Sequence, residues 1–293
     1  MRVIPDSEFI INPDGSIYHL HLRPEHISDT IITVGDPGRV LDVSRHFDSI
    51  DHRVQNREFL THTGTLGGKR LTVLSTGIGT DNMDIAMTEL DALANIDFQT
   101  RTVKKNITSL TIIRLGTSGA VSSDIPLDSI LISEAAIGID NLMSYYRQRN
   151  TSEEKALRDA FMKHVHHVFP LLHPYVASAD AALMQRFEDI GPRGVTVTAP
   201  GFYGPQGRLL RAELQASDLI SLLHSFRHQH YHITNLEMET SGLYALGGHL
   251  GHHCLSVSAI VAHRITNKFS DDPQRIIDKM IASALEILSS DRF

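Results

Sequence analysis

Three arginines supply the charge that a small, multiply charged anion needs. Arg39, Arg57 and Arg114 are permanent cations whose forked N–H donors match the oxygens of an oxyanion. Gly35 allows the backbone to approach closely, and Thr117 adds a hydroxyl and an N–H group. For Arg39 taken alone, a surface ion pair is the favoured interpretation. Arg114 follows an apolar run, so we expect it at a buried strand end, where a bound anion would explain a charge that is costly to bury unpaired.

The elements that must position these groups follow an α/β pattern. Apolar, β-rich runs predict strands at 30–34, 70–75, 110–115, 129–133, 194–198 and 254–262. Several are apolar on both faces, as in a covered sheet. Turns rich in glycine and hydroxyl groups follow the first three strands, at 35–39, 75–82 and 114–120, and each is predicted to run towards a helix. Anions bind to backbone N–H groups at such strand ends.

Two further helices are marked by their caps. Thr151 and Glu154 form a capping box, and Asp272 with Pro273 begins a last helix that carries an unbroken apolar stripe. No repeat or linker interrupts the chain. We therefore predict a single α/β domain over residues 1–293, with a central, largely mixed or parallel twisted sheet flanked by helices.

Composition excludes several classes of protein. The 293 residues carry a formal net charge of -7, which argues against binding to nucleic acid. No run approaches the ~20 apolar residues of a membrane helix, and the first residues do not resemble a secretory signal. Cys254 is the single cysteine, so no intrachain disulfide can form. We expect a cytoplasmic protein with no membrane partner.

Other familiar motifs fail on their spacing. The glycines at 77 and 79 begin a dinucleotide fingerprint, but Asn82 stands where its third glycine should be. The segment 67–70 lacks the Ser or Thr of a P-loop, and 116–119 lacks the spacing of a nucleophile elbow. Neither histidine cluster, at 228–232 or 249–253, has a zinc spacing with supporting carboxylates. We predict no metal site and no organic cofactor.

Four segments, taken together and in order, resemble the uridine phosphorylases of the nucleoside phosphorylase and nucleosidase family. They are 35–39 (GDPGR), 114–119 (RLGTSG), 202–208 (FYGPQGR) and 235–239 (NLEME). The flanking segments 18–20 (YHL), 56–59 (NREF) and 263–264 (HR) fall in the same order. The resemblance implies an enzyme that splits a nucleoside with inorganic phosphate as co-substrate.

For phosphate and sugar, the resemblance implies a site shared between two subunits. Arg57 would reach the phosphate of a neighbouring subunit, and His19 would contact the 5′ hydroxyl there, in a homo-oligomer built from dimers. Glu239 would accept hydrogen bonds from the ribose hydroxyls, with Met238 packed on the sugar. Glu237 lies alongside in the ribose site, although an acidic residue at a helix start is also an ordinary partner of the helix dipole.

For the base, the resemblance implies the pyrimidine branch of the family. Gln206 offers a donor and an acceptor to the imide edge of uracil, and Arg208 can stabilise negative charge on the departing base. Phe202 supplies a stacking face. Purine-cleaving relatives place an aspartate in the segment that matches 261–264, whereas Arg264 stands here as in the uridine enzymes, beside an unexpected His263.

Three alternatives stay open. A nucleosidase that uses water on the same fold would not need Arg39, Arg57 and Arg114 together. A purine nucleoside phosphorylase is disfavoured by Gln206 and Arg208. A non-catalytic relative is possible in principle, because a fold does not guarantee an activity.

Overall fold

The computed structural model describes residues 2–290. The main helices are α1 (Pro37–Ser44), α2 (Thr80–Asn95), α3 (Ser152–Val165), α4 (Ala181–Arg186), α5 (Leu219–Ser225), α6 (Thr240–Leu250) and α7 (Pro273–Ser289). The short 3-10 helices are η1 (Pro24–His26), η2 (Leu142–Tyr145), η3 (Glu188–Ile190) and η4 (Gly204–Gln206). The strands are β1 (Thr30–Val34), β2 (Ser49–Asn56), β3 (Phe59–Leu66), β4 (Lys69–Ser75), β5 (Ile96–Asp97), β6 (Thr102–Val103), β7 (Thr111–Ala120), β8 (Ile130–Gly138), β9 (Tyr175–Ser178), β10 (Arg193–Thr198), β11 (Arg227–His228), β12 (Tyr231–Glu237), β13 (His253–His263) and β14 (Lys268–Phe269).

Twelve of the strands form one mixed sheet, in the order β11-β12-β10-β8-β13-β7-β1-β4-β3-β2, with β14 beside β13 and β9 beside β8. β1 pairs in parallel with both β4 and β7, whereas β2, β3 and β4 form an antiparallel meander. The end of β7 also pairs with β12, so that β7, β13, β8, β10 and β12 form a closed ring of pairings. The prediction of a mixed sheet flanked by helices is confirmed.

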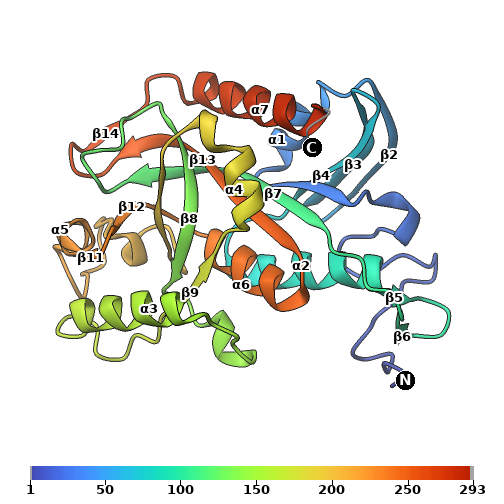
Figure 1. The fold of residues 1–293 in the computed structure, drawn as a ribbon, viewed down its shortest axis with the longest axis horizontal. Helices are drawn as coiled ribbons and strands as arrows, with labels where there is room; N and C mark the ends of the chain where they lie inside the picture. The colour runs from blue at the N-terminus through green and yellow to red at the C-terminus, as the bar shows by residue number, and fades with distance from the viewer. Residues whose placement is uncertain (1, 291–293) are drawn as a thin grey trace.

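Helices cover both faces of the sheet, as the apolar pattern of its central strands requires. On β1, Ile31 packs in the core cluster that contains α2 and α6, and Ile32 packs in the cluster that contains α1 and α7. Ile112 and Ile113 of β7 divide between the same two clusters, because successive side chains of a strand point to opposite faces. Figure 1 shows α1 and α7 on one side of the sheet and α2 and α6 on the other.

The turn predicted at 114–120 is wrong. These residues lie within β7, which pairs with β13 along its length and with β12 at its end, and β8 follows without an intervening helix. β13 pairs with this glycine-rich segment along its length, and β1 and β12 pair with its two ends on the other side, so it stays extended. The turns at 35–39 and 75–82 lead into α1 and α2 as predicted.

The predicted helix caps are confirmed. The Thr151 side chain accepts from the N–H of Glu154 in a complete capping box, and Asp272 accepts from the N–H of Arg275 at the start of α7. The whole apolar stripe of α7 is buried. Within residues 2–290, no helix is long and apolar enough to cross a membrane.

Candidate active site

A cavity of about 690 Å³ opens where β1, β4, β7, β12 and β13 end or bend near the loop before α5. The structure gathers ten of the predicted site residues around it: Gly35, Arg39, Arg114, Thr117, Phe202, Gln206, Arg208, Glu237, Met238 and Glu239. These residues come from segments up to about two hundred positions apart. The structure therefore brings most of the predicted site residues together around one cavity.

Gly35 and Arg39 reach the cavity from the start of α1. Asp36 caps this helix by accepting from the N–H of Gly38 at 2.8 Å, which fixes the direction of the glycine-rich turn. Arg39 is half-buried and donates only a long hydrogen bond of 3.4 Å, to the carbonyl of Leu115. Burial, and next the positive charge of Arg114, lower the pKa of Arg39. Two cations that face one cavity favour an anion between them.

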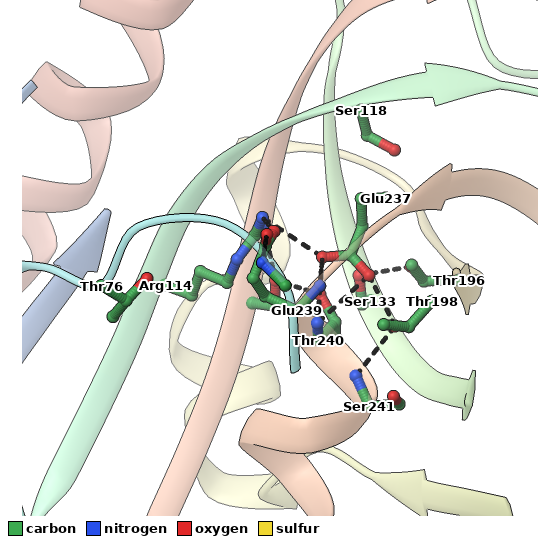
Figure 2. Close-up of polar contacts among 12 residues, drawn as sticks. Thr76, Arg114, Ser118, Ser133, Thr196, Thr198, Glu237, Glu239, Thr240 and Ser241 are labelled. Atoms are coloured by element: carbon green, nitrogen blue, oxygen red, sulfur yellow. Dashed lines mark hydrogen bonds and ion pairs between the residues drawn. The ribbon is translucent and has the colours of Figure 1, made fainter. Parts of the chain in front are cut away.

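Arg114 is buried as predicted, but its charge is not unpaired. Its Nη2 atom donates to Oε2 of Glu239 and lies 3.2 Å from Oε2 of Glu237 (Figure 2). Burial alone would lower the pKa of Arg114, but the two carboxylates outweigh it and the pKa is raised. The inference that a ligand must neutralise this charge was therefore wrong, and so was the placement of Arg114 at a strand end. An anion would join an existing ion cluster.

Glu239 stands at the junction of three elements. It precedes α6, its Oε1 atom accepts from the N–H of Gly79 at 2.7 Å, and its Oε2 atom faces Arg114. Burial raises the pKa of Glu239, the charge of Arg114 opposes this effect, and Glu237 adds to it. Glu239 lines the cavity, and each of its oxygens accepts from one donor, so each oxygen keeps a lone pair for a further donor.

Glu237 has a different environment from Glu239. Its carboxylate accepts from the hydroxyl of Thr198 at 2.6 Å, from the N–H of Glu239 at 2.8 Å and from the N–H of Thr240 at 2.9 Å. With Arg114 beside it, both oxygens are occupied. These contacts are those of a carboxylate at a helix start. Glu237 also lines the cavity, and its assignment to the ribose stays a prediction.

The residues predicted for the base form a connected group. Gln206 is only 3% exposed, and its Oε1 atom accepts from Nη1 of Arg208 at 2.7 Å. The same nitrogen donates to the carbonyl of Phe202, and the guanidinium lies 3.8 Å from the centre of the Phe202 ring. Burial, followed by the charge of Arg264, lowers the pKa of Arg208 to about 10. Because Oε1 of Gln206 is engaged, its amide N–H groups and Arg208 are left to donate to an acceptor on a ligand.

Arg264 does not line the cavity. Its Nη1 atom donates to the carbonyl of Gln206 at 2.9 Å, and its Nη2 atom points to the carbonyl of Gly207 at 3.4 Å. The prediction that Arg264 binds the base directly is corrected: it supports the loop that carries Gln206.

His19 and Arg57 lie together, and neither is among the residues that line the cavity, although Glu58, which follows Arg57, is. His19 donates its backbone N–H to Glu89, which also lies 2.7 Å from the His19 ring, and Asn56 donates to the His19 carbonyl. Arg57 is exposed at the two-residue turn between β2 and β3, and its guanidinium lies 5.6 Å from the Tyr18 ring. Its φ of 55° is a left-handed conformation that costs an L-residue about 1–2 kcal/mol.

Twelve lining residues were not predicted as site residues, and five of these are Glu58, Ile78, Asn82, Ser118 and Phe269. Four of these five belong to the segments 56–59, 75–82 and 114–119, which the sequence had already singled out. Phe269 lies on β14, a short strand that no pattern marked. Ile78 and Phe269 are 70% and 64% exposed, so the cavity has an apolar rim.

Comparisons with known proteins identify the family of this chain. The profile of the Phosphorylase superfamily matches residues 29–289. A uridine phosphorylase from Thermococcus kodakarensis is 27% identical over 281 residues, which cover 94% of this chain and 88% of the relative. A DeoD-type purine nucleoside phosphorylase from Myxococcus xanthus is 25% identical over 279 residues, which cover 92% and 95%. The solved structure of a Trypanosoma brucei nucleoside phosphorylase that shows uridine phosphorylase activity has a TM-score of 0.84 and 28% identity, and the match covers 95% of this chain and 99% of that one.

The chain belongs to the Phosphorylase superfamily. The family, the α/β fold and the enzyme class predicted from the four motifs are thereby confirmed.

Proposed function

We propose that this protein is a nucleoside phosphorylase that splits uridine and deoxyuridine, releasing uracil and ribose 1-phosphate or deoxyribose 1-phosphate. One observation carries the proposal. A single cavity combines Arg39 and Arg114, which can hold an oxyanion, with Gln206 and Arg208, which can donate to a base carbonyl. The reaction needs inorganic phosphate as co-substrate and no further cofactor.

The chemistry follows from these groups. A phosphate oxygen attacks the anomeric carbon, the bond from that carbon to the base nitrogen breaks, and the base leaves with the bonding electron pair. The phosphate gives up one proton and the base nitrogen finally carries one, so the protons of the reaction balance. Arg39, Arg114, Thr117 and the backbone at Gly35 would hold the phosphate, because charged donors bind oxyanions strongly in a desolvated site.

The sugar and base have their own partners in the proposal. Glu239 would accept from the ribose hydroxyls and Met238 would pack on the ring of the sugar. As the glycosidic bond breaks, the sugar becomes oxocarbenium-like and negative charge moves to the base carbonyls. Gln206 and Arg208 would stabilise that charge, and Phe202 would cover the ring.

We further propose that the active form is a homo-oligomer built from dimers with shared sites. Arg57 and His19 do not line their own chain's cavity, and Arg57 is held exposed at a strained turn. Backbone strain of this kind is retained where a side chain must be presented at a defined place. In a dimer, the partner's Arg57 would complete the phosphate site and the partner's His19 would contact the 5′ hydroxyl.

The test is to incubate the protein with uridine or inosine, with and without phosphate, and to measure the free base. The proposal expects uracil release that depends on phosphate, or on arsenate as its mimic. Equal uracil release in phosphate-free buffer would identify a hydrolase. Preferential release of hypoxanthine would identify a purine phosphorylase, an activity that the Myxococcus xanthus relative carries in its name.

A further inference from the structure

Glu237 is a buried carboxylate whose surroundings fix it from every direction. Its side chain is 2% exposed, and its donors are the hydroxyl of Thr198, two backbone N–H groups at the start of α6 and the guanidinium of Arg114 (Figure 2). The backbone donors would hold almost any carboxylate at a helix start. The hydroxyl of Thr198 is the one neutral side-chain donor that the structure gives to Glu237.

Thr198 is the last residue of β10, beside Glu237 in the parallel ladder. Its hydroxyl donates to Oε1 of Glu237 at 2.6 Å and accepts from the N–H of Ser241 at 2.9 Å. On the other side of β10 its ladder partner is Gly138, where a β-carbon would lie 2.8 Å from Oγ of Ser241. The absence of a side chain at Gly138 leaves this network room. Thr198 is fully buried and does not line the cavity.

We propose that Thr198 is a positioning residue for phosphate: its hydroxyl orients Glu237, and Glu237 in turn aims the guanidinium of Arg114 into the cavity. This inference rests on the proposed function for its substrate, because it assumes that Arg114 binds phosphate. A hydrogen bond from a neutral donor to a charged acceptor is stronger than one between two neutral groups, and it also fixes the orientation of the charged side chain. Without the hydroxyl, Oε1 of Glu237 loses its shortest contact and the N–H of Ser241 loses its acceptor.

A valine at position 198 keeps the size of the side chain and removes only the hydroxyl. We therefore expect Thr198→Val to weaken the affinity for phosphate, and to raise the KM for phosphate, by about tenfold or more, the effect of one hydrogen bond to a charged group. The KM for the nucleoside should change by less than about threefold, since Glu239 and the base residues keep their contacts. Thr198→Ser keeps the hydroxyl and should restore phosphate affinity to within about threefold of the native value.

Thr63→Val is the matched control. Thr63 is also a buried strand threonine with two hydrogen bonds, to the carbonyl of His26 and to Thr72, and it lies on β3, outside the cavity. Its variant should lower the melting temperature as Thr198→Val does, with no change in phosphate affinity. If Thr198→Val does not fold, Thr198→Ala and Thr198→Ser form a second pair that differs only by the hydroxyl.

Phosphate affinity should be measured by isothermal titration of the protein without nucleoside, beside the steady-state kinetics. This readout separates the two claims. Wild-type protein that binds phosphate but cleaves no nucleoside would contradict the proposed function. The role of Thr198 would then be decided by the phosphate affinities of the variants alone. Equal phosphate affinity in Thr198→Val and wild type, an equal loss in the valine and serine variants, or an equal loss in Thr63→Val would each overturn the positioning role.

Discussion

Gly116 and Arg114 lie two residues apart on β7, and the Arg114 guanidinium folds over the place where a side chain at 116 would begin. A β-carbon on Gly116 would lie 2.0 Å from Nη1 of Arg114. The missing side chain at Gly116 therefore leaves the space that the guanidinium occupies when it contacts Glu237 and Glu239.

This relationship predicts that Gly116→Ala displaces the guanidinium of Arg114. We expect the KM for phosphate to rise by about tenfold or more, because a charge-assisted contact is lost or misaligned. Gly248→Ala on α6 is the control, since a β-carbon there meets nothing within 4 Å. Steady-state kinetics at varied phosphate would check this, and unchanged phosphate dependence in Gly116→Ala would contradict it.

Replacing the two cavity arginines should separate catalysis from stability. Arg39→Met and Arg114→Met should each lower kcat/KM by the equivalent of about 2–4 kcal/mol, the usual loss for a charged donor in a desolvated site. Arg114→Met alone should also lower the free energy of unfolding, by about 3–5 kcal/mol, because it leaves Glu237 and Glu239 buried without their cation. Kinetics and urea unfolding of both variants would test this. Native catalytic efficiency in either variant would remove that arginine from the site.

Base choice should depend on Gln206 and Arg208. Changing both to alanine should reduce uridine cleavage by about a hundredfold or more, because the polar contacts that discriminate the base are lost together. The fold should persist, since both side chains belong to the connection between β10 and α5 rather than to the sheet. Arg211→Ala, three residues after Arg208 and exposed, serves as the control. A double variant that still prefers uridine to inosine would place the base elsewhere.

Mixed dimers test the shared site. We expect Arg57→Ala and Glu239→Ala each to be inactive, and activity to return when they exchange subunits, because one site of a mixed dimer then carries both lesions and the other neither. Random exchange at equal concentrations makes half of the dimers mixed, so recovery should approach roughly a quarter of the wild-type rate if the sites act independently. Exchange confirmed with labelled subunits but without recovered activity would show that Arg57 does not act across an interface.

Two stacked histidines predict how stability depends on pH. The ring centres of His26 and His52 lie 3.7 Å apart, and Nε2 of His52 is buried with no hydrogen-bond partner among residues 2–290. Burial is the main cause that lowers the pKa of both rings below 6.5. The charge of Arg70 lowers both pKa values further, and the charge of Glu25 opposes the shift in both. The unfolded chain therefore binds more protons just below pH 6.5, and stability should fall as the pH decreases through this range.

His52→Gln should make that decline shallower, because it removes one titrating ring and its repulsion of the other. His46→Gln, at an exposed position, should leave the slope as it is. Urea unfolding between pH 7 and pH 5 measures both slopes. Parallel curves for His52→Gln and wild type would show that the pair does not titrate in this range.

Elements that depend on a local sequence pattern were predicted from the sequence. Elements that depend on strand pairing between distant segments were missed. β1 begins and ends where its pattern indicated, and the α7 stripe is buried in full. The extension of β7 through 114–120 could not be predicted, because glycine and hydroxyl residues are typical of turns and the pairing of β7 with β12 joins residues more than a hundred positions apart. β2 and β3 were missed because neither carries a strong apolar signal: β2 alternates exposed and half-buried residues, and β3 is mostly buried although most of its residues are polar or glycine.

Within the site, residue types were easier to predict than their partners. The motifs placed Arg114, Glu237 and Glu239 in one cavity, but nothing in their spacing indicated that the two carboxylates already neutralise the arginine. Thr198 had a usable signal, since it ends a predicted strand at the edge where ligands gather. Arg264 was assigned to the base from its position in a motif, and only the folded loop shows that it contacts backbone carbonyls.

α2 touches both halves of the proposed shared site. At the N-terminus of α2, the N–H of Gly79 donates to Glu239, which lines the cavity of the same chain. Glu89 lies ten residues further along the helix, a rise of about 15 Å, and contacts the ring of His19. A rigid helix that shifts when Glu239 takes up a sugar would carry His19 with it, and in a dimer that histidine belongs to the other site. We therefore expect cooperativity between the two sites, with saturation curves that depart from a hyperbola. The deviation of mixed-dimer recovery from a quarter would measure the sign and size of that coupling.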